Sequence, residues 1–403
     1  MNAPIYLDNN ATTRCAPEAV AAMLPYFTEQ FGNPSSMHGF GSRVGHAVKA
    51  ARASLQKLLG AEYDSEIVYT AGGTEADNTA ILSALKAQPE RKEIITTVVE
   101  HHAVLHLCDQ LEKEGYTVHR LTVDGQGRLD LAAYQALLSE RVAIVSVMWA
   151  NNETGTYFPV ERMAEMAKAA GVLFHTDAVQ AVGKIPLDLA GSAIDMLSLS
   201  GHKLHGPKGI GALYLRRGVR FRPLLRGGGQ ERGRRAGTEN VPGIIGLGVA
   251  AELALAHMQE ENTRVRALRD RLQAGILAAV PHAFATGDLG NRLPNTLNIA
   301  FEYVEGEAIL MLLNKQGIAA SSGSACTSGS LEPSHVMRAM GIPYTAAHGT
   351  IRFSLSRENT DAEIDRVIAA VPAIIAQLRK LSPYWGENGP VTDPEKAFAP
   401  TYA

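Results

Sequence analysis

The chain has 403 residues, of which 46% are hydrophobic and 20% are charged, close to the averages of globular proteins. This length predicts two or three folded units. A formal net charge of −3 argues against a protein built mainly to bind nucleic acid or an anionic membrane, and no apolar run of about 18 residues predicts a transmembrane helix. The first residues, "MNAPIYLDNNATTR", lack the basic and apolar regions of a secretory signal.

Short β-rich runs alternate with helical patterns through the first two-thirds of the chain. Buried strands are predicted at 66–70, 94–99, 142–148, 172–176, 196–200 and 210–215. Helices are predicted at 75–87 and 160–171, and the second ends on Gly171, a residue typical of the position after a helix. This alternation is typical of an α/β fold with a mostly parallel sheet and helices on both faces.

A second α/β unit follows a glycine- and arginine-rich stretch after Gly218 and two helical runs within 241–279. Its predicted strands are 296–301, 318–321 and 349–356, and its predicted helices are 306–317, 333–341 and 362–380. The tail beyond Leu381 contains Pro383, Pro390, Pro394 and Pro400, and we expect it to form an extended arm.

The three cysteines, Cys15, Cys108 and Cys326, are widely spaced and odd in number, which argues against a disulfide framework and favours a reducing cytoplasm. Cys108 has apolar neighbours at helical spacing and is expected to be a buried core thiol. Cys326 lies in "SSGSACTSGS", a run of small residues that packs poorly, and has no obvious structural role.

In an open parallel sheet, ligands bind beyond the carboxyl ends of the strands. After the first strand, Gly73 and Thr74 open a helix whose N-terminus favours a phosphate or carboxylate, although Gly-Gly-Thr is also an ordinary turn. After the second strand, His101 could stack on a planar cofactor or be a structural residue. His102 and His106 have the spacing of a metal pair, but no third ligand lies near them in sequence.

The later strand ends also carry reactive side chains. Asn151 and Asn152 suit a turn or a ligand contact. Asp177, with Gln180 after it, could pair with a cationic ring nitrogen, form a buried ion pair or cap a helix. Lys203 would be a surface residue in most settings, but burial after an apolar strand would lower its pKa, as imine formation with a carbonyl requires.

Together these strand ends supply an anion cradle, a stacking ring, a carboxylate and an imine-forming lysine, the set of groups that pyridoxal 5′-phosphate requires. Two cationic features stand apart from them. The loop 226–235, with Arg226, Arg232, Arg234 and Arg235, favours a phosphate or a partner subunit over nucleic acid because no aromatic residues interleave with it. Arg352, inside a predicted strand, is either paired structurally or binds a substrate carboxylate.

The ordered set of motifs resembles that of the pyridoxal-phosphate cysteine desulfurases of the class V aminotransferase group, and is most similar to their nitrogen-fixation type. The resemblance rests on "YLDNNATT" (6–13), "FGNPSS" (31–36), "TAGGTEADN" (70–78), "VVEHHAV" (98–104), "ANNETG" (150–155), "HTDAVQAVGK" (175–184), "SGHKLHGPKGIGALY" (200–214), "GGGQERGRRAGTEN" (227–240) and "SSGSACTSG" (321–329). It implies a fold type I enzyme, with a large domain (15–258) around a mostly parallel seven-stranded sheet. The small α/β domain would comprise 1–14 and 259–381, and the arm 382–403.

The resemblance also implies a role for each matching residue. Lys203 would hold pyridoxal phosphate by an imine, Asp177 would pair with the ring nitrogen, Gln180 with the ring oxygen, and His101 would stack on the ring and move protons. The phosphate would be bound by Gly73, Thr74, Ser200, His202 and, from the second subunit of a homodimer, Thr238. The substrate L-cysteine would be placed by Asn152 and Arg352.

In the implied reaction, Lys203 removes the α proton of cysteine, and the Cys326 thiolate takes the sulfur as a persulfide while alanine leaves. A flexible ten-residue segment spans roughly 16–19 Å, which suits a loop that carries sulfur to a scaffold protein for iron–sulfur cluster assembly in nitrogenase maturation. Catalysis would need no metal, although Cys326 could ligate a cluster during transfer.

Alternatives are a selenocysteine lyase or a class V aminotransferase, and, from another class, a non-catalytic thiol carrier or Fe–S binding module. No nucleic acid and no membrane are expected as partners.

Overall fold

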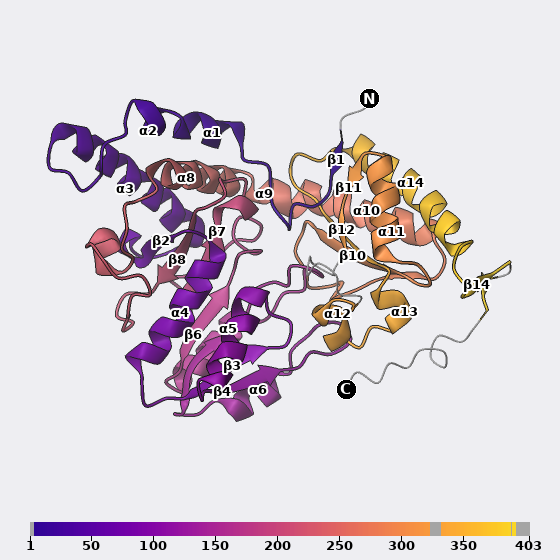
Figure 1. Ribbon diagram of the computed structural model, residues 1–403, viewed down its shortest axis with the longest axis horizontal. Helices are drawn as coiled ribbons and strands as arrows, with labels where there is room; N and C mark the ends of the chain where they lie inside the picture. The colour runs from indigo at the N-terminus through magenta and orange to yellow at the C-terminus, as the bar shows by residue number, and fades with distance from the viewer. Residues whose placement is uncertain (1–3, 323–331, 388, 392–403) are drawn as a thin grey trace.

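The computed structural model describes residues 4–322, 332–387 and 389–391, which form two α/β units side by side (Figure 1). The larger unit is built on a seven-stranded sheet in the order β2-β8-β7-β6-β5-β3-β4. Its strands are β2 (Ile67–Thr70), β3 (Glu93–Thr97), β4 (Thr117–Leu121), β5 (Val142–Ser146), β6 (Leu173–Asp177), β7 (Met196–Ser200) and β8 (Gly211–Leu215). Only β8 runs antiparallel to its neighbours in this sheet, which confirms the predicted architecture.

Helices cover both faces of this sheet because most of its strands are fully buried and present apolar side chains alternately to each face. One face packs against α4 (Gly73–Ala87) and α5 (His102–Lys113). The other packs against α3 (Gly39–Leu59), α6 (Leu131–Leu137), α7 (Val160–Ala169) and α8 (Val241–Ala256). The short helices α1 (Pro17–Met23) and α2 (Pro25–Thr28) precede α3 (Figure 1).

The smaller unit has its own hydrophobic core, in which the N-terminal residues Ile5 and Leu7 pack with residues from 265 to 375. Its four-stranded sheet has the order β12-β13-β10-β9. The elements around this core are β9 (Ala283–Ala285), β10 (Thr296–Phe301), β12 (Ser321–Ser322) and β13 (Thr350–Ser354), with α10 (Arg266–Ala279), α11 (Gly306–Lys315) and α14 (Asp361–Arg379). The buried residues of α12 (His335–Ala339) and α13 (Tyr344–Ala347) pack with the core of the larger unit instead. A short helix, α9 (Met258–Glu260), and a π-helical turn, Glu261–Val265, join α8 to α10.

The predicted strand 318–321 is wrong as a single element, because the chain changes partners within it. β11 (Ile318–Ala319) pairs in parallel with β1 (Ile5–Tyr6), whereas β12 pairs with β13. The tail beyond Leu381 forms a small hairpin of β14 (Trp385–Gly386) and β15 (Gly389–Pro390) before the described residues end. Among the described residues no single helix is long and apolar enough to cross a membrane, and α8 passes that test only with the following run Met258–Ala279, at a bend of 55°.

The N-terminal segment runs from the smaller unit across the carboxyl ends of the large sheet. Leu7 N donates to Ala319 O at 2.8 Å and Asn9 N to Ser354 O at 3.1 Å. A few residues later Thr13 N donates to His202 O at 2.8 Å, beside the end of β7. This crossing places residues 8–12 over the edge of the sheet where ligands are expected.

Candidate active site

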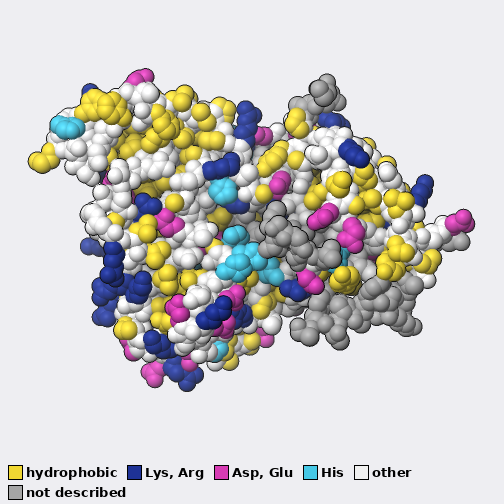
Figure 2. All heavy atoms as spheres, in the orientation of Figure 1, with side chains coloured by type: hydrophobic (Ala, Val, Ile, Leu, Met, Phe, Trp, Pro, Cys, Tyr) yellow, Lys and Arg dark blue, Asp and Glu magenta, His cyan; other side chains and the backbone are white. Residues whose placement is uncertain are grey.

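A pocket of about 350 Å³ lies at the carboxyl ends of the parallel strands, between the two units. It brings together the predicted residues Gly73, Thr74, His101, Asn152, Asp177, Gln180, Ser200, His202, Lys203 and Arg352. The sheet topology explains this, because the ends of neighbouring parallel strands meet at one edge. Histidine side chains gather over α5 at the centre of this face, where the two units meet (Figure 2).

Lys203 ends a single 3₁₀ turn, Gly201–Lys203, directly after the buried strand β7. The tight turn favours glycine at 201, because a Cβ there would lie 3.0 Å from the carbonyl oxygen of Pro207. Nζ of Lys203 donates to the carbonyls of Asn10 at 2.5 Å and Ala11 at 2.8 Å. Burial, helped by the charges of Arg352 and Lys184, lowers the pKa of Lys203 to about 8. A lysine that loses its proton this close to neutrality can attack a carbonyl carbon.

The N-terminus of the fifteen-residue helix α4 opens towards Lys203. Gly73 and Thr74, with Ser200 and His202, line both the main pocket and a more open cavity of about 670 Å³ beside it. Glycine at 73 lets the start of α4 approach Val179 closely, since a Cβ there would lie 2.8 Å from Val179 Cγ2. The free backbone N–H groups and the helix dipole favour a phosphate at this end of the pocket.

His202 contributes a neutral ring to that cradle. Its Nδ1 lies 3.1 Å from Thr12 Oγ1, and burial together with the Lys203 charge lowers its pKa to about 4. Thr238, by contrast, is exposed on the segment after Gly237 and is not among the residues that line either cavity of its own chain.

Asp177 is buried at the end of β6, and its Oδ1 accepts from Val179 N at 2.9 Å, so the side chain caps the following turn. Burial raises its pKa to about 6, against the opposing effect of Lys203. Gln180 Nε2 donates to Asn10 O at 3.0 Å. The buried Oε1 of Gln180 has no hydrogen-bond partner among the described residues. These two side chains fit a ring that presents a cationic nitrogen and a hydroxyl, so the donor set suits pyridoxal phosphate.

A buried polar cluster of His175, Ser146, Ser198 and Asp77 lies close to Asp177. The buried ring of His175 lies 2.9 Å from the hydroxyls of both Ser146 and Ser198, and its Nε2 is 3.7 Å from Asp77 Oδ1. Burial and the charge of Asp177 raise the pKa of Asp77 well above its usual range. Asp77 therefore favours its neutral form when Asp177 is ionised.

His101 is the N-cap of α5, and its Nδ1 accepts from Ala103 N at 3.1 Å. It is exposed at the mouth of the pocket, yet the partial burial of its ring and the charge of Lys203 lower its pKa to about 4. The neutral ring therefore carries its proton on Nε2. His102, behind it, stacks near His106 and His335 at centroid distances of 4.9 and 5.0 Å.

Arg352 on β13 is both paired and directed into the pocket. Its Nη2 donates to Asp8 Oδ1 at 2.9 Å and its Nη1 to Asn152 O at 3.0 Å. Its buried Nε has no partner among the described residues. A guanidinium held in this way can still offer a donor and its charge to a carboxylate.

Cys326 lies outside the described residues. Ser321, which precedes that segment in sequence, and His335, which follows it, both line the pocket. Of the other cysteines, Cys108 is a buried core residue, as predicted, and burial raises its pKa to about 12. Cys15 is half-buried near the start of α1.

Several residues that line the pocket were not predicted from the sequence, namely Asp8, Asn10, Asp77, Glu153 and His335. Asp8 and Asn10 were visible only as part of the motif at 6–13. Asp77 follows Thr74 by one turn of α4, and this spacing could have indicated that both face the same strand ends. Glu153 is buried, accepts from Ser334 Oγ at 2.6 Å, and has its pKa raised by burial to about 7.

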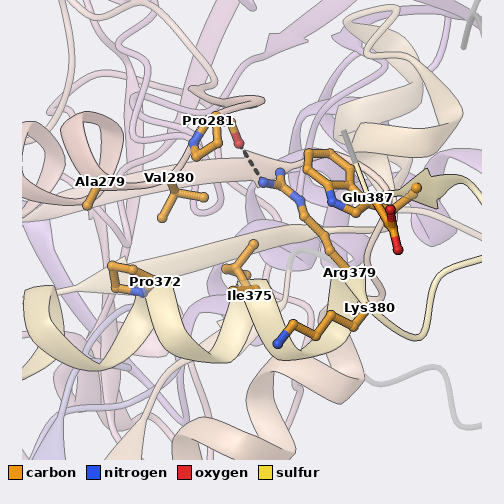
Figure 3. Close-up of a pocket in the computed structure, with 11 residues that line it drawn as sticks. Ala279, Val280, Pro281, Pro372, Ile375, Arg379, Lys380 and Glu387 are labelled. Carbon is orange, nitrogen blue, oxygen red and sulfur yellow. Dashed lines mark hydrogen bonds between the residues drawn. The ribbon is translucent and has the colours of Figure 1, made fainter. Parts of the chain in front are cut away.

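A third cavity, of about 600 Å³, lies in the smaller unit between α10, α14 and β14, away from the other two (Figure 3). Arg379 spans it, donating to Pro281 O at 2.7 Å and stacking over Trp385 at 4.3 Å. Its other donors are bonded to the carbonyls of His282 and Glu302. The arginine therefore holds the hairpin against the core, and the reactive groups lie in the first pocket.

Comparisons with known proteins give a consistent result. The sequence model of the aminotransferase class-V family matches residues 5–367. The chain is 75% identical to "Cysteine desulfurase NifS" of Azotobacter vinelandii, over 99% of this chain and 100% of that one, and 70% identical to a cysteine desulfurase of Gluconacetobacter diazotrophicus, over the full length of both.

Among solved structures, a "NIFS-LIKE PROTEIN" aligns with a TM-score of 0.87 at 38% identity, covering 93% of this chain and 100% of that one. A structure described as "SspA in complex with cysteine" aligns with a TM-score of 0.78 at 35% identity, over 87% of this chain and 98% of that one.

Proposed function

Since this chain belongs to the aminotransferase class-V family and is a cysteine desulfurase, we propose that Lys203 holds pyridoxal 5′-phosphate in the pocket and that Cys326 receives the sulfur of L-cysteine. Enzymes of this family use that cofactor as a general property. The observation that carries the proposal is the position of the Lys203 amine, which has a lowered pKa and lies between a phosphate cradle and a buried carboxylate.

The residues present fit each part of the cofactor. Lys203 would hold the aldehyde carbon, Asp177 the ring nitrogen and Gln180 the ring oxygen, with His101 against the ring. The phosphate would be held by Gly73, Thr74, Ser200 and His202. When bound, pyridoxal phosphate supplies an electron sink for charge that develops at the α carbon of an amino acid.

The substrate is placed by charge. Arg352, with Asn152 beside it, binds the α carboxylate of cysteine. Once its Nζ is free, Lys203 takes the α proton, because an amine with a pKa near 8 is a competent base at neutral pH. The neutral His101, which carries its proton on Nε2, can donate that proton within the pocket.

Sulfur transfer then needs one thiol from the protein. The Cys326 sulfur bonds to the substrate sulfur, the Cβ–S bond breaks, and Cβ takes up a proton, so that L-cysteine and the thiol become L-alanine and a persulfide. We propose that a scaffold protein for iron–sulfur clusters removes this sulfur in the cytoplasm and that the clusters serve nitrogen fixation, as the name of the relative from Azotobacter vinelandii indicates.

A homodimer is proposed as the functional form. Val20, Leu24, Phe27, Phe31 and Met37, in and after α1 and α2, form an exposed apolar face, visible as the hydrophobic patch over α1, α2 and α3 in Figure 2. Thr238 would reach the phosphate of the partner subunit across this contact. The proposed division into 15–258, 1–14 with 259–381, and the arm 382–403 is supported by the packing of Ile5 and Leu7 in the smaller core.

A pair of variants tests the proposal. Cys326→Ala should keep the visible absorption of the bound cofactor and lose alanine release, whereas Cys15→Ala should keep both. Borohydride reduction followed by peptide mapping should label Lys203. Sustained alanine release by Cys326→Ala would overturn the assigned role of the thiol.

A further inference from the structure

A second lysine lies directly behind Lys203. Lys184 is only 6% exposed, and its Nζ donates to the backbone carbonyl of Lys203 at 3.1 Å. The two residues come from different loops, since Lys184 follows β6 and Lys203 follows β7. This contact therefore joins the loop that carries Asp177 and Gln180 to the turn that presents the reactive amine.

The loop geometry directs Lys184 towards that carbonyl. Gly183 has a φ of +80°, and a Cβ there would lie 3.2 Å from both Leu204 and Ala254. Lys184 N donates to Ala181 O at 3.0 Å, and its own carbonyl accepts from Asn262 Nδ2 at 2.9 Å. Hydrogen bonds thus hold the backbone N–H and carbonyl of Lys184, and the bond from Nζ to the Lys203 carbonyl holds the end of its side chain.

One acidic residue, Glu261, shares the buried surroundings of Lys184. Glu261 is buried nearby, and its Oε2 has no hydrogen-bond partner among the described residues. A small cavity of about 10 Å³ is lined by Lys184, Lys203 and Glu261, so the three charged residues face one enclosed space. Burial lowers the pKa of Lys184 and the charge of Glu261 opposes that effect.

We propose that Lys184 is a positioning residue for Lys203, holding its carbonyl and setting the electrostatic potential at its amine. The proposal deepens the proposed function and rests on it. The other charged groups that act on the Lys203 amine are Arg352 from β13, Asp177 from β6 and Asp8 from the N-terminal segment, and its hydrogen bonds go to the carbonyls of Asn10 and Ala11. Burial is the main cause of the lowered pKa of His202 and His205, and the charge of Lys184 contributes to it. Lys184 differs from all of these because it contacts the backbone of the reactive lysine.

The test is a spectrophotometric pH titration of the holoenzyme, read as the midpoint of the visible absorbance of the lysine-bound cofactor. Lys184→Gln removes the charge and keeps an amide donor, whereas Lys184→Met removes both. Both should raise the midpoint by about half to one pH unit, because a positive charge that opposes protonation is gone. Lys184→Met should also release the cofactor about 3- to 10-fold faster on dialysis, because the hydrogen bond to the carbonyl is lost.

Lys168→Gln, on the exposed side of α7, is the matched control and should leave the midpoint and the release rate unchanged. An unchanged midpoint in both Lys184 variants would overturn the proposal. If Lys184→Met does not fold, the midpoint of Lys184→Gln decides. Borohydride mapping separates the two levels: a label on another amine refutes the proposed function, whereas a label on Lys203 with unchanged midpoints refutes this inference alone.

Discussion

Arg352 and Asp8 form an ion pair at 2.9 Å although 344 residues separate them in sequence. The pair joins a central strand of the smaller unit to the N-terminal segment that crosses the pocket. Because Asp8 already neutralises part of the guanidinium charge, a substrate carboxylate must share Arg352 with it. The pair thus sets how strongly the pocket attracts an anion before any chemistry occurs.

Arg352→Lys should raise the KM for cysteine by about 10- to 100-fold, with a smaller effect on kcat. Lysine keeps the charge but lacks the planar fork by which two separate nitrogens of Arg352 reach Asp8 and the Asn152 carbonyl, and a lost charge-assisted hydrogen bond costs about 1.5–3 kcal/mol. Alanine release at varied cysteine concentration measures this. Arg271→Lys, at an exposed arginine paired with Asp361 on α14, is the control and should behave as the native enzyme. An unchanged KM in Arg352→Lys would show that another group binds the carboxylate.

His101→Asn should lower kcat by about 10²- to 10⁴-fold while the protein keeps its stability within a few tenths of a kcal/mol. Asparagine is a favoured N-cap and can replace the acceptor that Nδ1 provides to Ala103 N, but it cannot stack or transfer a proton as the imidazole does. Since the pKa of His101 is lowered to about 4, the native rate should show no titration of this ring between pH 6 and 8. Thermal unfolding and steady-state rates measure the two effects, and His106→Asn, at an exposed histidine five residues later, is the control. A large loss of stability with a normal kcat would reduce His101 to a helix cap.

Glu153→Gln should flatten the pH dependence of stability between about pH 4 and 7. Burial raises the pKa of Glu153 to about 7, so in this window the folded state holds a proton that the unfolded state has lost. Stability therefore falls as the pH rises, by up to about 1.4 kcal/mol per unit, and glutamine removes this contribution while keeping an acceptor for Ser334. Urea unfolding at pH 5, 6 and 7 measures the difference. Glu165→Gln, in an exposed pair with Arg162, should keep the native slope, and the same slope in Glu153→Gln would contradict the shifted pKa.

The parts of the fold that the sequence predicted are those whose side chains are uniformly buried. β5, β7 and β8 are buried at every position, and their apolar runs predicted them directly. β4 was missed because it is an edge strand whose residues, "TVHRL", are mostly exposed or half-buried and include two basic side chains. The strand at 318–321 was predicted as one element because nothing in "IAAS" marks a change of pairing partner.

The residues of the pocket likewise fall into those that the sequence could place and those that it could not. Residues directly after parallel strands, such as Asp177 and Lys203, could be placed together from topology alone. Asp8 could not, because it reaches the pocket through the crossing of the N-terminal segment, which is a tertiary feature. Glu153 follows Asn152 at the same strand end, but its burial against Ser334 Oγ comes from the smaller unit and is likewise a tertiary feature. Lys184 ends the motif at 175–184, but no role was predicted for it. A lysine gives no sign in sequence that its amine is buried against another residue's carbonyl.

Phe27→Asp should dissociate the proposed dimer. Phe27 is 60% exposed on α2, a helix with no buried residue, and Leu24 and Phe31 beside it are exposed to a similar degree. In an interface with twofold symmetry each substitution acts twice, so the loss of two buried phenyl rings, at about 1.5–3 kcal/mol each, weakens association by at least 10²-fold even before the cost of burying a carboxylate. The fold of each subunit should be unaffected because the side chain packs against little within its own chain.

Sedimentation velocity should give the mass of a single chain, and cofactor retention should fall if Thr238 of one subunit serves the phosphate of the other. Leu381→Asp, at a residue 77% exposed beyond the end of α14, should keep the native mass, and a native-sized Phe27→Asp would place the subunit contact elsewhere.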